Sequence, residues 1–309
     1  MTIDFIFEWN DFSWCPTTTY VKYFKKIKEL RPDIEFNFVN AVEKREEARD
    51  KTYFGHASLY GPFYCMIKNR ANNKYILISY WDSIKDIFES RFSHFDLSSM
   101  VELITSIGVT VNDIEFRPIS YLKYTPFGYI SLSPENERVA EDLVKLDIAK
   151  INPDRPKFRN FPNDPFRQFI MADKRFDGID RRDNNLSIRE YMEELNASKI
   201  NLNINGHGEI CHRDMEVLAL GNVLLRPKFV VQFHEPLIPD FHYIAVDFNN
   251  YRDYQTTADK LINKYNEVKD NKELLDFIGK NAREWYLRNG CTDGNADLLV
   301  KLVDFKKLE

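Results

Sequence analysis

Along the chain, segments with the apolar spacing of strands alternate with segments that have the apolar spacing of helices. This order predicts an α/β protein. Residues 3–7 and 34–39 show the alternation of short strands, whereas residues 20–30 carry apolar side chains at helical spacing. Pro32 ends the predicted helix, because proline lacks the amide that would continue its hydrogen bonding. This order predicts a β-loop-α-β unit, the first step of a parallel sheet.

The same alternation of strand and helix continues through the rest of the chain. Ser187 followed by Glu190 has the pattern of a capping box at the start of one helix. No sequence repeat or low-complexity tract interrupts the alternation. The predicted strands are 75–79, 109–123, 166–172 and 243–248, and the predicted helices are 83–88, 135–146, 188–196, 256–268, 273–288 and 296–305.

The stretch 198–227 combines a strand, a glycine-containing turn, a helix and a second strand. Ile200, Leu202 and Ile204 alternate with asparagines, as they would in a strand. Gly206 and Gly208 follow, and without Cβ atoms they let backbone amides approach a ligand closely. This pattern is typical of a phosphate-binding βαβ unit.

The helix predicted after this turn has an apolar face and a polar face. His212, Arg213 and Glu216 lie on one polar arc that begins at the helix N-terminus, where partial positive charge attracts anions. The pattern therefore predicts a cation and a carboxylate beside an anion-binding terminus. Two alternatives remain open: Glu216 can be a solvent-facing partner of His212, and Arg213 can form a structural salt bridge with Asp214 or a neighbouring loop.

Residues 151–164 contain three prolines and many polar side chains, which is the strongest change in composition along the chain. We place a domain boundary here, between one domain at 1–152 and a second at 153–309, and the last helix can pack back on the first domain. Two Rossmann-like domains facing a cleft are the architecture that this division predicts.

Composition narrows the function classes. The chain has 309 residues with 43% hydrophobic side chains, and 43 Lys+Arg against 48 Asp+Glu give a net charge of −5, so nucleic acid is not an expected partner. Its 4 cysteines form no C-x2-C pair, and neither a signal sequence nor a long apolar run is present. We expect a cytoplasmic protein without a transmembrane segment; the pattern does not indicate an oligomeric state.

The segment after the strand at 200–204 also resembles a known family. The run GHGEICHRDMEVLALGNVLLRP, followed by EPLIPDFHYIAVD, is similar to the nucleotide-sugar half of GT-B glycosyltransferases, in particular the exostosin-like and CAP10-like (family 90) groups, which include viral and bacterial relatives. The resemblance covers about half of the chain. The matching positions are Gly206, Gly208, Arg213, Glu216, Gly221, Val223, Pro239, His242, Tyr243 and Val246.

The resemblance implies transfer of a sugar from a UDP or GDP sugar to a glycan or other hydroxyl acceptor. The second domain would bind the donor and the first domain the acceptor. Arg213, with His212 and the turn at Gly206 and Gly208, would bind the diphosphate, and Glu216 would accept hydrogen bonds from the ribose.

Two further residues complete the donor site that the resemblance implies. Arg175 follows the predicted strand 166–172, where relatives place a cation for the donor phosphate; a solvated charge cluster is its alternative. His242 would contact the donor or tether its own loop.

The catalytic base would come from the first domain. Glu209 and Glu216 are separated by six residues, one fewer than in the E-x7-E motif of many retaining relatives, so we expect an inverting enzyme. Asp11, at the end of the first predicted strand, is the first candidate, ahead of Asp82 and His56. The alternative for Asp11 is a cap of the following turn.

No short-range pair of metal ligands is present, so we expect a metal-independent reaction with no cofactor besides the donor substrate. Two other functions remain open: a non-catalytic glycan-binding module with a GT-B shell, and a sugar-nucleotide epimerase. A dehydrogenase is disfavoured, because no G-x-G-x-x-G follows the first strand.

Overall fold

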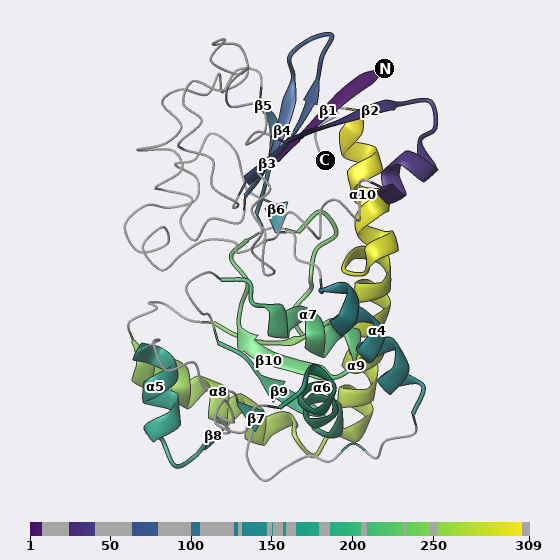
Figure 1. Ribbon diagram of the computed structural model, residues 1–309. Coiled ribbons are helices and arrows are strands. Elements are labelled where there is room, and N and C mark those ends of the chain that lie inside the picture. The colour runs from purple at the N-terminus through teal and green to yellow at the C-terminus, as the bar shows by residue number, and fades with distance from the viewer. Residues whose placement is uncertain are drawn as a thin grey trace. The chain divides into compact units, whose positions relative to one another are not determined.

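The computed structural model describes most of the C-terminal half and separate segments of the N-terminal half (Figure 1). The described residues divide into two compact units: unit 1 comprises Met1–Tyr129, Val231–His234 and Thr292–Glu309, and unit 2 comprises Ile130–Val230 and Glu235–Cys291. The division predicted between residues 152 and 153 stays a prediction. The described ranges are 1–7, 25–40, 64–79, 100–105, 127–128, 132–146, 150, 157–158, 165–178, 186–204, 209–231, 233–247 and 253–304.

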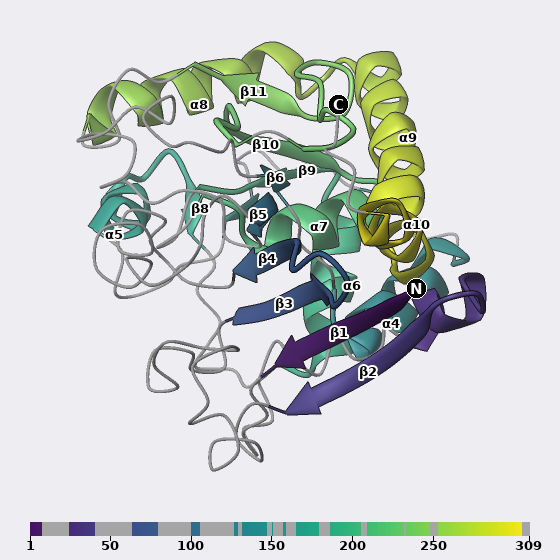
Figure 2. The same cartoon turned by 90° about the horizontal axis from the view of Figure 1, so that it is seen from above.

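Unit 1 contains a mixed sheet in the order β2-β1-β3-β4-β5-β6. β1 and β2 are parallel, as the opening pattern predicts, whereas β3 runs antiparallel to both β1 and β4. Figure 2 shows β2, β1, β3 and β4 side by side. The strands are β1 (Thr2–Phe7), β2 (Glu35–Asn40), β3 (Tyr64–Asn69), β4 (Tyr75–Ser79), β5 (Met100–Thr105) and β6 (Phe127–Gly128).

Alternation sends the side chains of β1 to the two faces of this sheet, and both sets are buried. Ile3 and Phe5 are fully buried, and Ile27, from the helical residues 25–30, is buried as well. Asp4 points to the other face, where Arg70 Nε donates to its carboxylate at 2.7 Å. Helix α10 (Thr292–Val303) also belongs to unit 1.

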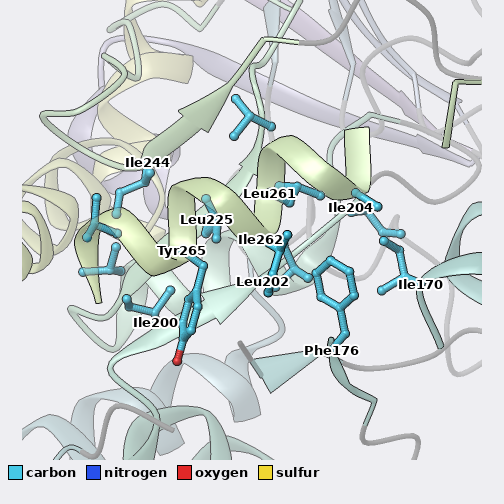
Figure 3. Close-up of a cluster of buried hydrophobic side chains, with 14 of the residues drawn as sticks. Ile170, Phe176, Ile200, Leu202, Ile204, Leu225, Ile244, Leu261, Ile262 and Tyr265 are labelled. Carbon is cyan, nitrogen blue, oxygen red and sulfur yellow. The ribbon is translucent and has the colours of Figure 1, made fainter. Parts of the chain in front are cut away.

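Unit 2 contains a sheet in which every pair is parallel, in the order β11-β10-β9-β7-β8. Helix α8 packs on one face of this sheet (Figure 3), where Leu261 and Tyr265 lie against Ile200, Leu202 and Leu225. The mixed sheet of unit 1, the parallel sheet of unit 2 and their helices confirm the α/β class. The strands are β7 (Lys157–Phe158), β8 (Asp177–Gly178), β9 (Ile200–Leu202), β10 (Val223–Pro227) and β11 (Ile244–Val246).

The helices of unit 2 agree with the predicted pattern, apart from one. Ser187 and Glu190 form the predicted capping box of α6. The strand predicted at 166–172 is wrong, because these residues form α5, whose Phe166 and Ile170 are buried one helical turn apart. The helices are α4 (Pro134–Val144), α5 (Pro165–Ala172), α6 (Ile188–Ala197), α7 (His212–Ala219), α8 (Tyr254–Val268) and α9 (Lys272–Asn289).

Two glycines bring α7 and α9 close together. Gly221, directly after α7, has a φ of 65°, a left-handed conformation that favours glycine. A Cβ on Gly279 of α9 would lie 2.5 Å from the Gly221 carbonyl oxygen. The short step from α7 into β10 therefore depends on the absence of both side chains. No helix among the described residues is long and apolar enough to cross a bilayer.

Candidate functional site

The candidate site lies at the carboxyl end of β9, where the chain passes into α7 and returns as β10. β9 and β10 are parallel neighbours, and α7 crosses between them, so the predicted βαβ order from residue 198 to residue 227 is confirmed. In open parallel sheets, ligands bind at the carboxyl ends of the strands. Gly206 and Gly208, the two predicted turn glycines, lie outside the described residues.

An aspartate anchors the first turn of α7. The amide of Cys211, the N-cap residue, donates to Asp214 Oδ2 at 2.8 Å. Asn203 Nδ2, just beyond the end of β9, donates to Asp214 Oδ1 at 2.5 Å. Asp214 therefore ties the end of β9 to the start of α7 and satisfies one of the helix's unpaired amides.

A fully buried arginine completes this anchor. Because Val223 and Leu225 face α8, alternation points Arg226 to the other face of the sheet, toward α7. Its Nη1 lies 2.5 Å from Asp214 Oδ2, and both side chains have no solvent-exposed surface. Its guanidinium also lies 3.6 Å from the centre of the Phe229 ring, so the charge is covered by protein on all sides.

Arg213 and Glu216 belong to a second network, formed by three helices. Arg213 Nε donates to Tyr191 Oη of α6 at 3.3 Å, and Tyr191 Oη donates to Glu216 Oε2 at 2.6 Å. Asn136 Nδ2 of α4 donates to Glu216 Oε1 at 3.0 Å. The two residues that the sequence selects are thus linked through a tyrosine hydroxyl. Burial, the largest cause, raises the pKa of Tyr191 to about 12, which keeps its proton available to Glu216.

Among the residues that the structure describes, Arg213 is a buried cation without an acidic partner. Its exposed fraction is 9%, and within the described part of the chain neither Nη1 nor Nη2 makes a hydrogen bond or ion pair. Asp214, the salt-bridge partner that the alternative interpretation gives to Arg213, is bonded to Arg226 instead. A buried charge without a partner is costly, whereas a phosphate would match the fork of a guanidinium.

Glu216 is also buried, with 5% exposed, so it is not the solvent-facing residue of the alternative interpretation. Each carboxylate oxygen already accepts one hydrogen bond from the protein. An ionised carboxylate offers about four acceptor positions, so ribose hydroxyls can still bind beside Tyr191 and Asn136.

The other predicted donor residues lie in different surroundings. His212 is the exposed first residue of α7. Arg175 pairs with Asp173 at 2.6 Å and with Asp259 at 2.7 Å, and it follows a helix, α5, instead of the expected strand. The argument that placed Arg175 at a strand end is therefore wrong, and its donor role stays an untested prediction.

His242 is buried in a tight turn. Its Nδ1 accepts a hydrogen bond from the Ile238 amide at 2.9 Å, so its side chain tethers the loop before β11. Burial lowers the pKa of His242, while Glu235 opposes that shift. Tethering is one of its two predicted roles, and contact with the donor stays a prediction.

The candidate bases Asp11, Asp82 and His56 lie outside the described residues. Within the described ranges, no group of three or more His, Cys, Asp or Glu side chains is arranged to hold a metal ion.

Sequence reasoning missed five residues of these two networks: Asn136, Tyr191, Asn203, Asp214 as an anchor, and Arg226. Asn136 is 80 residues from Glu216, and no local pattern could connect the two. For Arg226 a signal existed, since an arginine in the apolar run VLLRP requires a buried partner.

Comparison with known proteins gives fold neighbours only. No family model matches the chain, and no curated protein matches it. Solved structures similar to it include a glycosyltransferase from Rickettsia africae ESF-5, with a TM-score of 0.44 and 12% identity over 96% of this chain and 83% of that chain. S. aureus TarM, in a mutant complex with fondaparinux, alpha-GlcNAc-glycerol and UDP, has a TM-score of 0.40 and 10% identity over 98% and 99% of the two chains. The Rickettsia africae neighbour is named a glycosyltransferase, and the TarM structure contains UDP.

Proposed function

We propose that this chain transfers a sugar from a nucleoside-diphosphate sugar to a hydroxyl group of a glycan or other acceptor. The observation that carries the proposal is Arg213 in the first turn of α7, a nine-tenths buried residue whose guanidinium has no acidic partner among the described residues. A diphosphate supplies the missing negative charge, and its oxygens fit the two terminal nitrogens of arginine.

Glu216 supports a nucleotide over a free phosphate. It lies one helical turn from Arg213, and Tyr191 bonds to both side chains. A carboxylate accepts hydrogen bonds from the ribose hydroxyls, while the cation and the helix terminus bind the diphosphate. The network thus matches a ligand that carries hydroxyl groups and phosphate close together.

The proposed reaction is an inverting transfer without a metal ion. The acceptor oxygen forms a bond to the anomeric carbon, the bond from that carbon to the diphosphate oxygen breaks, and the acceptor proton goes to a base. Asp11 is our candidate for that base. Arg213 would stabilise the negative charge that develops on the departing nucleoside diphosphate, which is the role that a preorganised cation performs best.

Thermal unfolding with ligands tests the donor site. We expect UDP or GDP, or one of their sugars, to raise the melting temperature at millimolar concentration, because a ligand that binds only the folded state stabilises it. Arg213→Met should abolish the shift. Arg189→Met is the matched control, because Arg189 is an exposed cation of the same unit that pairs with Glu193 in α6. A wild-type protein unaffected by every nucleotide would refute the proposal.

Product analysis tests turnover. Incubation with a panel of nucleotide sugars and glycan acceptors should give a transferred product that mass spectrometry detects, and Asp11→Asn should lower its rate by about 100-fold or more. Nucleotide binding without transfer or hydrolysis of any donor would favour the non-catalytic glycan-binding module.

A further inference from the structure

We propose that the buried Arg226–Asp214 ion pair is a positioning device for the donor site. It fixes the chain between residues 209 and 214 against the chain that leaves β10, and it thereby sets where Arg213 and the start of α7 meet the donor diphosphate. This inference rests on the proposed function and assigns Arg226 as a positioning residue, not a catalytic one.

The guanidinium of Arg226 bonds to one carboxylate and to two backbone carbonyls. Besides its bond to Asp214, Nη2 donates to the Glu209 carbonyl at 2.9 Å and Nε donates to the Pro227 carbonyl at 3.0 Å. Glu209 comes before α7, Asp214 lies within its first turn, and Pro227 ends β10. A single planar group therefore holds the segment that enters α7 to the end of the neighbouring strand.

The side chain of Glu209 adds a second tie between the same two segments. Glu209 is fully buried, and its Oε1 accepts a hydrogen bond from the Val230 amide. The segments before α7 and after β10 are thus held twice, once by Arg226 reaching back to residue 209 and once by Glu209 reaching forward to residue 230. Two opposed ties restrict sliding as well as separation.

Asn203 provides an independent observation at this corner, because one of its buried polar atoms has no partner in the described chain. Its Nδ2 donates to Asp214. This contact fixes the orientation of the amide, because the amide oxygen has no hydrogen to donate to a carboxylate. Its Oδ1 is buried, and no group of the described chain donates to it. A hydroxyl or N–H of a bound nucleotide sugar is the kind of donor that this oxygen requires.

Stability alone is a weak reason to bury this ion pair. Removing two charges from water is costly, and apolar replacement of a complete buried pair is often neutral or stabilising. Three directed bonds from a rigid, planar group do supply geometry, which apolar side chains would not. The pair therefore has the properties of a positioning element.

The test compares two double variants of the full chain. Asp214→Asn with Arg226→Met removes both charges and keeps an acceptor for the Cys211 amide. Lys199→Met with Asp276→Asn is the matched control, because it removes another ion pair of the same unit, at 2.5 Å, located at the amino end of β9. The readouts are the melting temperature, amide hydrogen exchange of residues 209–214, and the dissociation constants of UDP, UMP, GDP and GMP.

We expect the Asp214→Asn, Arg226→Met variant to unfold cooperatively, to exchange its 209–214 amides faster, and to bind the preferred diphosphate roughly ten- to a hundred-fold more weakly. Binding of the matching monophosphate should weaken less, because the displaced groups contact the distal phosphate. The control should bind both ligands as the wild type does. A general loss of structure would weaken both ligands equally, so the ratio of the two affinities separates positioning from stability.

Each failure has its own signature. If the wild type binds neither UDP nor GDP, the proposed function falls, and this inference falls with it. If the wild type binds one of them and the Arg226 variant binds it equally well, only the positioning inference is overturned, as it is if the control weakens binding to the same extent. If the double variant does not fold, the single variant Arg226→Lys is the test, because it keeps a cation for Asp214 and loses the forked contacts. Unchanged diphosphate affinity of this variant overturns the inference. Weaker affinity at an unchanged melting temperature supports it.

Discussion

Two buried arginines in unit 2 differ in the groups that surround their positive charges. Arg226 has a carboxylate, two carbonyls and an aromatic ring around its guanidinium. Arg213 has one tyrosine hydroxyl and, among the described residues, no acidic partner. A folded protein normally compensates a buried charge, so Arg213 is the place where we propose that the donor diphosphate binds.

Glu216 should recognise the ribose of a nucleotide. We expect wild-type protein to bind UDP or GDP more tightly than the 2′-deoxy form of the same nucleotide, and Glu216→Gln to lose that preference, because an amide accepts fewer hydrogen bonds than a carboxylate. Isothermal titration of both ligands to both proteins measures this. An equal preference in the two proteins would exclude contact between Glu216 and the 2′-hydroxyl.

The hydroxyl of Tyr191 should contribute both to the stability of the protein and to nucleotide binding. Tyr191→Phe removes the donor to Glu216 and the acceptor for Arg213, so we expect a loss of about 1–2 kcal/mol in the free energy of unfolding and weaker nucleotide binding. Urea unfolding with and without UDP or GDP checks both effects. Tyr254→Phe is the control, because Tyr254 contributes its ring to stacking on Phe166, 5.0 Å away, elsewhere in the unit.

His242 should make the protein less stable in acid. Burial lowers its folded pKa below the unfolded value, so its contribution is fully present above the unfolded pKa and is lost as the pH falls through the folded one. Protonation of Nδ1 also removes the acceptor for the Ile238 amide. Between about pH 7 and pH 5, the free energy of unfolding should fall less steeply in His242→Gln than in wild type. Equal slopes would show that other groups cause the acid sensitivity.

At the scale of elements, α7 is short, and its position depends on contacts at both ends. Asp214 anchors its first turn, while Arg283 of α9 donates to the Ala219 carbonyl and Lys150 donates to the Leu220 carbonyl at 3.3 Å. An isolated helix of eight residues would be unstable in water, so tertiary contacts must hold it. Any element that presents Arg213 at a fixed place needs such support.

The approach of α9 to α7 gives a test at this scale. Gly279→Ala places a methyl group 2.5 Å from the Gly221 carbonyl oxygen, so backbone must move apart, and we expect a loss of about 1–3 kcal/mol. Alanine is otherwise the better helix former, by about 1 kcal/mol, so a stabilised variant would contradict this packing. Asn281→Ala is a helix control, because Asn281 is only partly buried and bonds within its own helix. Thermal unfolding of the three proteins decides.

For the whole molecule, the two units have separate sheets, and the proposed donor site belongs to one of them. Trp285 is buried in unit 2, where its Nε1 donates to the Glu235 carbonyl at 2.9 Å, whereas the chain's three other tryptophans lie outside the described residues. Fluorescence of Trp285 alone would therefore report on the donor unit.

A variant in which Trp9, Trp14 and Trp81 are replaced by phenylalanine should make this measurement possible. UDP or GDP at 100 times its dissociation constant should stabilise the Trp285 transition by about 2.7 kcal/mol. A variant in which Trp285 alone is replaced, and which keeps the other three tryptophans, is the control. A nucleotide that binds the protein but leaves the Trp285 transition unchanged would contradict a donor site in unit 2.

The sequence by itself determined the α/β class and the elements around the candidate site. Ser187 with Glu190 predicted the start of α6, and the alternation at residues 200–204 predicted β9, because capping and side-chain periodicity are local properties. The strand predicted at 166–172 failed for a related reason: a short apolar run suits a buried strand and a buried helix equally, and only packing decides between them.

Tertiary structure decided which charges are paired. The sequence selected Arg213 and Glu216 from their spacing in one helix, and it offered Asp214 as a partner for Arg213. Folding instead brings Arg226, from the next strand, to Asp214, and brings Asn136 and Tyr191, from two other helices, to Glu216. Such pairings join residues up to 80 positions apart and depend on how helices and strands pack. The sequence could therefore select Arg213, but only the fold reveals that it is a buried cation left without an acidic partner in the described chain.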